Sequence, residues 1–299
     1  MHATLKYLLV LSVAIAASGH SLQPGDVVFH LFTRQNPQES RPVLPTFASL
    51  LNSTVYNPTL PTIISIHTSG QGVGGNFAAF IVRDHLARED VNIFAVDWSP
   101  GSSMYSEGLS QAPQCGRIIA NFINDVIIAE LSYDVNQIRF VGHGLGAHVA
   151  GIAARLINGN VPHIFALDPS LVGWTHHPER LNPDDATLVE VLHTTAGILG
   201  YDYPLGDLDF YPNGGSFQPG CATDVSCSHT YAYAFYAESL TSEITNGAKF
   251  VGTKCDSYDQ AITMSCSGDK DAIFGGTETK TSTGIYTFST NIFPPFAQG

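Results

Sequence analysis

Residues 139–157 read RFVGHGLGAHVAGIAARLI, and this stretch decides the fold. It predicts a strand over 138–141 that runs through Gly142-His143-Gly144-Leu145-Gly146 into a helix over 147–157. Small residues at both ends of the turn allow such a tight connection to close. A phosphate-binding loop is a poor alternative, because no Lys followed by Ser or Thr comes after the glycines and their spacing is not that of a dinucleotide site.

The segments on both sides of this turn alternate between strand and helix patterns. Short apolar runs predict strands, and apolar side chains at helical spacing predict amphipathic helices. Strands that are apolar throughout are typical of a mainly parallel sheet covered by helices on both faces, so the sequence predicts an α/β fold. Residues 99–111 and 197–225 are expected to be loops. The predicted strands are 60–67, 91–98, 138–141, 163–167, 187–193, 249–253 and 284–289, and the predicted helices are 76–88, 115–131, 147–157 and 229–240.

Two polar residues downstream indicate what the turn is for. Asp168 ends the strand HIFALD, 24 residues after Gly144, and His229 follows 61 residues later. A nucleophile, an acid and a base in this chain order are the catalytic residues of α/β-hydrolases, whose nucleophile lies at the centre of a strand–turn–helix elbow. Here the central residue is Gly144, which has no side chain to attack a substrate. The sequence therefore indicates an α/β-hydrolase fold that keeps the acid–base pair without its nucleophile.

Composition narrows the class of protein. The 299 residues carry a formal net charge of −13, from 13 Lys and Arg against 26 Asp and Glu, which argues against nucleic acid and anionic membrane surfaces as main partners. Hydrophobic residues make up 44% and charged residues 13% of the chain, so it can bury a large core and is not a disordered protein. No linker divides the pattern, and we expect a single domain over 20–299.

The N-terminus has the features of a secretory signal peptide. Lys6 precedes an apolar run over 8–17, and small residues follow at 17–19, so a signal peptide is predicted over 1–19. The run is too short to span a bilayer as an anchor, and no other stretch reaches that length, which predicts a soluble, secreted protein. Asn52-Ser53-Thr54 is an N-glycosylation sequon, so Asn52 is expected at the surface.

The five cysteines fit an oxidising compartment. Cys221 and Cys227 are close in sequence, as are Cys255 and Cys266, and this spacing predicts two local disulfides. Their spacing matches no zinc pattern. Cys115 lies at the start of an apolar helical run, where we expect a buried free thiol.

Several motifs from residue 60 onward agree with one family. They are IH at 66–67, VDW at 96–98, VGHGLGAHVAG at 141–151, ALDPS at 166–170, VLHT at 191–194, DLDFYPNGG at 207–215, QPGC at 218–221, CSH at 227–229 and CDSY at 255–258. With these motifs the chain resembles the animal pancreatic-lipase family, which includes insect phospholipases A1 and insect yolk proteins. The resemblance implies that Asp168 and His229 hold the acid and base positions and Gly144 the serine position. It also implies that the oxyanion donors are the backbone N–H groups of Leu145 and Ser69.

The chain departs from that family at four places. Thr68 stands where the family usually has Gly, which affects the geometry of the Ser69 donor. Only five residues, ATDVS, lie between Cys221 and Cys227, so the lid is short, as in the phospholipase A1 branch. The family's calcium loop maps to 180–185, where Asn182 replaces one acidic ligand. This segment is either a calcium site built on Asp185, weakened by the lost carboxylate, or a solvated acidic turn. We also expect no C-terminal lipid-docking domain of the kind that the larger lipases have.

Three functions follow from the missing nucleophile. The first is a secreted, inactive lipase-like protein that binds a lipid or another apolar molecule in the old acyl cleft. The second is an active phospholipase A1 or triglyceride lipase with an unusual mechanism. The third is a storage protein of the yolk-protein kind. No cofactor is predicted apart from the calcium alternative.

Overall fold

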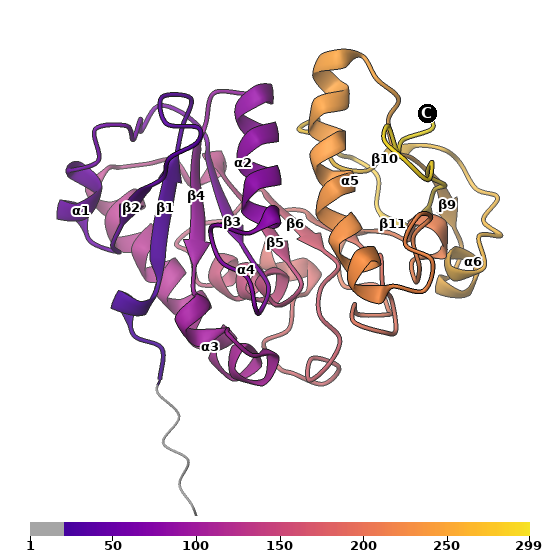
Figure 1. Ribbon diagram of the computed structural model, residues 1–299, viewed down its shortest axis with the longest axis horizontal. Helices are drawn as coiled ribbons and strands as arrows, with labels where there is room; N and C mark the ends of the chain where they lie inside the picture. The colour runs from indigo at the N-terminus through magenta and orange to yellow at the C-terminus, as the bar shows by residue number, and fades with distance from the viewer. Residues whose placement is uncertain (1–20) are drawn as a thin grey trace, which may run out of the picture.

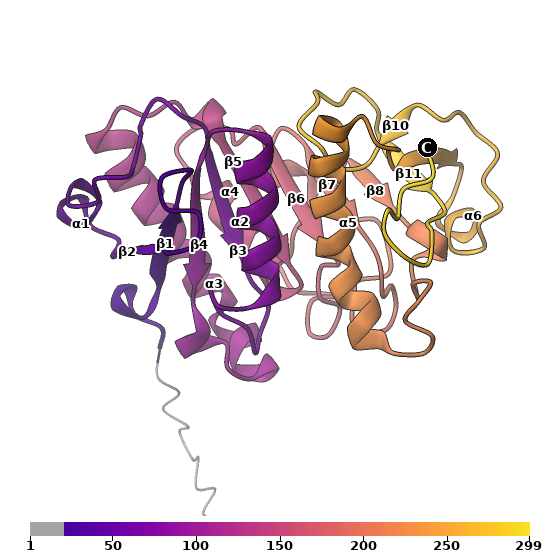
Figure 2. The same cartoon turned by 45° about the horizontal axis from the view of Figure 1, so that its top comes forward.

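A single twisted sheet runs through the whole of the described chain. The computed structural model describes residues 21–299, so the signal peptide predicted over 1–19 lies outside the described residues. Within 21–299 the sheet has 11 strands in the order β10-β9-β11-β8-β7-β6-β5-β3-β4-β1-β2 (Figures 1 and 2). The central strands from β4 to β11 pair in parallel, and antiparallel strands close both edges.

The elements have the following bounds. The strands are β1 Val28–Phe32, β2 Arg41–Val43, β3 Thr62–Ile66, β4 Asn92–Asp97, β5 Ile138–His143, β6 His163–Leu167, β7 Val189–Leu192, β8 Leu208–Phe210, β9 Val251–Cys255, β10 Ala272–Ile273 and β11 Gly284–Thr287. The helices are α1 Phe47–Leu51, α2 Asn76–Arg88, α3 Tyr105–Asn121, α4 Leu145–Arg155, α5 Val225–Thr245 and α6 Tyr258–Ile262.

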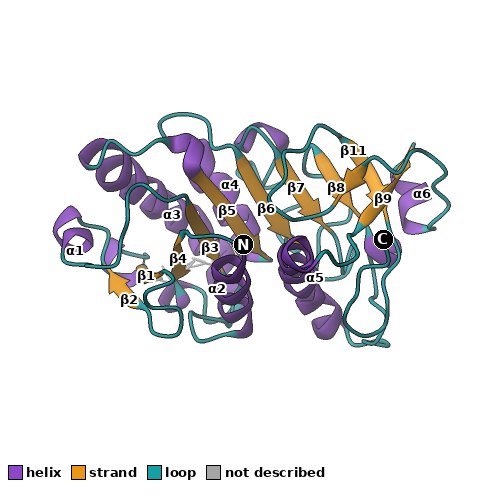
Figure 3. Ribbon diagram, turned by 90° about the horizontal axis from the view of Figure 1, so that it is seen from above, coloured by secondary structure: helices purple, strands orange, loops and turns teal. Residues whose placement is uncertain are grey.

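Helices cover both faces of the sheet, as the sequence predicts. Helices α3 and α4 pack on one face and α2 and α5 on the other (Figure 3). Each strand contributes side chains to the cores on both faces of the sheet, because successive side chains point to opposite faces. In β4, Phe94 and Val96 join the core under α3 and α4, whereas Ile93 and Ala95 join the core under α2 and α5. The α/β-hydrolase fold class is therefore confirmed.

The prediction is wrong for the segment after β4. The second half of the loop predicted over 99–111 is helical, because α3 begins at Tyr105 and contains Gly108 and Pro113. Both residues are poor helix formers, and the sequence pattern concealed the helix for that reason. Tertiary packing overrides this preference: a Cβ added to Gly108 would lie 2.7 Å from Leu145 Cδ1, so α3 and α4 pack too closely there for a side chain. The remainder of the helix predicted over 115–131 is the π-helical segment Phe122–Glu130.

Other differences are smaller. Strand β8 lies inside the loop predicted over 197–225, and three residues are too few to show a periodic pattern. Helix α5 begins at Val225 and ends at Thr245, beyond both ends of the predicted 229–240 helix. The edge strands β1, β2 and β10 were not predicted. Among residues 21–299 no helix has the length and apolar character needed to cross a bilayer.

Candidate active site

The elbow predicted from the sequence is present between β5 and α4. Gly144 separates the two elements with φ +56° and ψ −116°, a conformation that L-residues rarely adopt. The small flanking residues let the turn close. A Cβ on Gly142 would lie 2.5 Å from Ala147 Cα, and one on Gly146 would lie 2.7 Å from the His67 carbonyl oxygen. Gly144 thus lies at the carboxyl edge of the parallel strands, where open α/β sheets bind their ligands.

Asp168 and His229 meet beside this elbow. Asp168 follows β6 and is fully buried, and His229 lies near the start of α5. His229 Nδ1 is 2.6 Å from Asp168 Oδ2, so Nδ1 carries the hydrogen and donates it to the carboxylate. Nε2 then holds a free lone pair on the side of Gly144, 3.1 Å from a Cβ built on that glycine. The predicted acid and base are therefore paired and aimed at the serine position.

The carboxylate of Asp168 is held by more than His229. Its Oδ1 accepts hydrogen bonds from the backbone N–H groups of Thr194 (2.8 Å) and Thr195 (3.0 Å), and its Oδ2 accepts one from the Thr195 hydroxyl. Burial raises the pKa of Asp168, but the hydrogen bond and charge of His229, with the Thr195 donors, outweigh burial and hold this pKa below its ordinary value. The sequence motif VLHT at 191–194 marks this loop, but the pattern did not reveal that it binds Asp168.

A disulfide fixes the turn of helix that presents His229. Cys221 and Cys227 are bonded, with their Cα atoms 5.5 Å apart. Asp224, inside the disulfide loop, caps α5 by accepting a hydrogen bond from the Cys227 N–H at 3.0 Å. The short segment predicted to be a reduced lid is therefore a turn that leads through the N-cap Asp224 into α5. The second predicted disulfide, Cys255–Cys266, is also present, and Cys115 is free and buried, as predicted.

Thr68 fills the space on the nucleophile side of the site. It follows β3 and is nearly buried. A Cβ built on Gly144 would lie 2.8 Å from Thr68 Cβ and closer still to its hydroxyl oxygen. The same hydroxyl oxygen accepts a hydrogen bond from the Leu145 N–H at 3.2 Å. Thr68 therefore takes both the space that a serine side chain would need and the backbone donor that the family resemblance assigns to an oxyanion.

The structure brings Gly144, Leu145, Asp168 and His229 together, with Thr68 between them. The loop 68–75, which includes the half-buried Ser69, is tied to its neighbour by the Gly70 N–H to Ser102 carbonyl bond of 2.8 Å. The sequence indicated that Thr68 would disturb the Ser69 donor. What it did not reveal is that the Thr68 hydroxyl binds the other donor, Leu145.

His143 packs against the ring of His229 and bonds to its backbone. The two rings lie 4.2 Å apart between centroids, and His143 Nε2 is 3.1 Å from the His229 carbonyl oxygen, so Nε2 donates that hydrogen bond. Burial, together with the nearby His229, lowers the pKa of His143 well below its ordinary value. His143 is consequently a neutral positioning residue for the start of α5.

Asp185, the carboxylate of the predicted calcium site, is already paired with Arg155. Arg155 Nε lies 2.7 Å from Asp185 Oδ1, and Asn182 donates to the same carboxylate through its N–H (3.0 Å) and its side-chain amide (3.1 Å). These residues do not fit calcium, because the guanidinium and two amide donors take the carboxylate oxygens that a hard cation would need. Within residues 21–299 no group of three or more His, Cys, Asp or Glu side chains is arranged to hold a metal.

Comparison with known proteins agrees with this geometry. The model of the family described as Lipase matches residues 8–283, so the chain belongs to the lipase family. It is 31% identical over 247 residues to pancreatic lipase-related protein 2 of Cavia porcellus, covering 80% of this chain and 56% of that protein. It is 31% identical over 268 residues to the pancreatic triacylglycerol lipase of the same species, covering 81% and 56%.

A third relative is lipase member H of Oryctolagus cuniculus, which is 32% identical over 244 residues, with coverage of 76% of this chain and 51% of the relative. The chain thus spans little more than half the length of these curated relatives. Family membership and fold are therefore established, and activity has to be argued from the site itself.

Proposed function

We propose that this protein is a lipase-family member that does not hydrolyse esters and instead binds a lipid or another apolar molecule at the carboxyl edge of its sheet. The single observation that carries the first part is the position of Thr68. Acyl transfer needs a nucleophile beside the base and free donors for the oxyanion. Gly144 offers no nucleophile, and the Thr68 hydroxyl already accepts the Leu145 N–H.

Exposed apolar side chains at the same edge support the binding role. Met104, Val172, Ile198, Leu199 and Phe217 are between 37% and 65% exposed. They lie on the connections that follow β4, β6, β7 and β8. Because these strands are parallel, all five side chains lie at the carboxyl edge of the sheet. Two hydrogen bonds join these loops, from the Tyr105 hydroxyl to the Val172 carbonyl (2.7 Å) and from the Leu171 N–H to the Leu199 carbonyl (2.8 Å). An apolar rim of this kind suits a hydrocarbon ligand.

We propose an extracellular setting for this role. The two disulfides are typical of oxidising compartments. Asn52 of the sequon is exposed after α1, which suits a glycosylation site. A signal peptide over 1–19 and a mature single domain over 20–299 complete the proposal.

Two assays on the purified secreted protein test the proposal. The first compares hydrolysis of short-chain esters and phospholipids by the wild type and His229→Ala, and we expect equal, background rates. The second extracts bound lipid for mass spectrometry, and we expect an apolar molecule that is lost when Met104→Asp and Phe217→Asp are combined. Hydrolysis that disappears with His229→Ala would contradict the inactive assignment. Protein free of apolar ligand would favour a storage role.

A further inference from the structure

A long hollow follows helix α2, on the face of the sheet that α2 and α5 cover. It has a volume of about 840 Å³, within the range of about 300–1,000 Å³ that is usual for small-molecule sites. Its floor is formed by the nearly buried side chains of Phe32, Ala78, Val82 and Leu86. Ala79 and Ala87 on the exposed side of α2 are too small to close it. We name this hollow the α2 groove.

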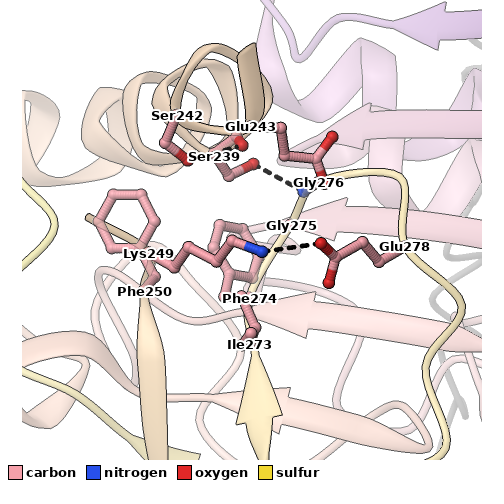
Figure 4. Close-up of a pocket in the computed structure, with 10 residues that line it drawn as sticks. All are labelled: Ser239, Ser242, Glu243, Lys249, Phe250, Ile273, Phe274, Gly275, Gly276 and Glu278. Carbon is pink, nitrogen blue, oxygen red and sulfur yellow. Dashed lines mark hydrogen bonds and ion pairs between the residues drawn. The ribbon is translucent and has the colours of Figure 1, made fainter. Parts of the chain in front are cut away.

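Size distinguishes the α2 groove from the pocket beside Gly275 and Gly276. That pocket has a volume of about 10 Å³, room for no more than one water molecule. Polar contacts across it, drawn in Figure 4, are Lys249 to Glu278 at 2.7 Å and the Gly276 N–H to Ser239 Oγ at 2.9 Å. Such a pocket can hold no organic ligand, whereas the α2 groove can.

The charge of the α2 groove is opposite to that of the protein. Arg34 and Arg83 are the charged residues among those that line it, in a chain with twice as many acidic as basic residues. Arg83 is neutralised by Asp84, to which its Nε and Nη2 donate at 2.8 and 2.7 Å, and its guanidinium lies over the Phe80 ring. Arg34 pairs with no carboxylate among residues 21–299. Its Nε donates to the Leu86 carbonyl at 2.9 Å, which fixes the guanidinium at one end of the groove.

We propose that the α2 groove binds a single-chain amphiphile with an anionic head, of which a long-chain fatty acid is the representative. The hydrocarbon chain lies on Phe32, Ala78, Val82 and Leu86, and the carboxylate pairs with Arg34. From Gly75 to Leu86 the groove extends along about 17 Å of helix, which suits a long alkyl chain. A charge-assisted hydrogen bond to a carboxylate then selects the acid over the corresponding alcohol.

This site is separate from the ligand proposed at the carboxyl edge. None of the residues that line the α2 groove is Thr68, Gly144 or His229. The groove can therefore bind fatty acid whether or not the edge binds a ligand, and Met104→Asp with Phe217→Asp affects the edge alone.

Binding of cis-parinaric acid, a fluorescent fatty acid, to the full-length secreted protein after lipid extraction tests the proposal. Ala79→Trp places a large side chain in the groove from an exposed helix position. Ser110→Trp, at an exposed position of α3 on the other face of the sheet, is the matched control. Circular dichroism and melting temperature verify that both variants are folded. We expect Ala79→Trp to abolish saturable binding and Ser110→Trp to leave it unchanged.

A comparison of a long-chain acid with the matching alcohol tests the role of Arg34. We expect Arg34→Gln to weaken binding of the acid by about tenfold, the size of one charge-assisted hydrogen bond, and Arg34→Lys to restore most of it. Displacement by the matching long-chain alcohol should not depend on Arg34. Equal affinity in Ala79→Trp and Ser110→Trp, or equal displacement by acid and alcohol in the wild type, would overturn the proposal.

Discussion

The two halves of the elbow site differ in what their polar atoms do for the rest of the protein. In the acid–base half, Asp168 accepts hydrogen bonds from His229, Thr194 and Thr195, and so ties α5 and the loop after β7 to the end of β6. In the nucleophile half, Gly144 contributes no side chain, and the Leu145 N–H bonds to Thr68. The first half therefore joins separate elements of the fold, whereas in the second Thr68 occupies the space beside Gly144 that a nucleophile would need.

This difference explains how the acid and base can persist without a nucleophile. Removing His229 would take one hydrogen-bond donor from the buried carboxylate of Asp168, and an unmet hydrogen bond to a buried charged group is costly. Replacing a serine at the elbow by glycine has no such cost, since glycine relieves a strained conformation there. Retention of Asp168 and His229 is thus consistent with a protein that does not hydrolyse esters.

The largest effect should come from rebuilding the nucleophile half. Gly144→Ser alone would place its side chain against Thr68, and Thr68→Gly alone would supply no nucleophile. The double variant supplies both the hydroxyl and a free Leu145 N–H. Loss of one oxyanion donor costs about 10²–10³ in kcat, so we expect the double variant to exceed Gly144→Ser by at least about 100-fold on short-chain esters.

The control for this experiment is His229→Ala in the double variant, which should return the rate to background because the new serine would lose its base. If Gly144→Ser alone reaches the rate of the double variant, Thr68 does not block the site.

The sequence predicted the acid–base half better than the nucleophile half. Asp168 and His229 could be located because strand order and chain order place an acid and a base at one edge of the sheet. Thr68 could be flagged only as an unusual residue, since its hydroxyl meets Leu145 through a contact 77 residues apart in sequence. Contacts of this kind depend on side-chain conformation, which periodicity does not encode. The first part of helix α3 was not predicted for a related reason, because close packing against α4 stabilises a segment whose glycine and proline disfavour a helix.

Asp168→Asn should show the structural role of the acid–base half. Removing the negative charge leaves His229 and the Thr195 donors without their ionised acceptor, and the loss of a hydrogen bond to a charged group costs about 1.5–3 kcal/mol. Thr68→Ser, which removes one methyl group from the nucleophile half, should cost about 1 kcal/mol. Urea unfolding of the two variants measures both values. Equal losses would contradict the division into a structural and a dispensable half.

The pH dependence of stability also tests the structural role of Asp168. The pKa of Asp168 is lower in the folded protein than its ordinary value of 3.8. Its contribution to the free energy of unfolding is therefore complete above that ordinary value and is lost as the pH falls through the folded-state pKa. Between pH 7 and about pH 3 the wild type should lose more stability than Asp168→Asn does. Equal falls in the urea midpoints of the wild type and Asp168→Asn would show that another group determines the loss of stability in acid.

Calcium should have the smallest effect. Because Arg155 already pairs with Asp185, we expect added calcium or a chelator to change the melting temperature of the wild type by less than about 1 °C. Differential scanning calorimetry measures this. A fall in melting temperature on chelation, reversed by calcium, would show that the segment 180–185 binds the ion after all.

The central claim is that the nucleophile half of the site is closed, and covalent labelling with an alkyl phosphonate ester tests it most directly. Such a reagent reacts with a hydroxyl that a neighbouring base activates, and intact-mass spectrometry counts the groups attached. We predict no attachment to the wild type and one group on the Thr68→Gly/Gly144→Ser variant, mapped to position 144. Attachment of one group to the wild type that is lost in His229→Ala would contradict the account.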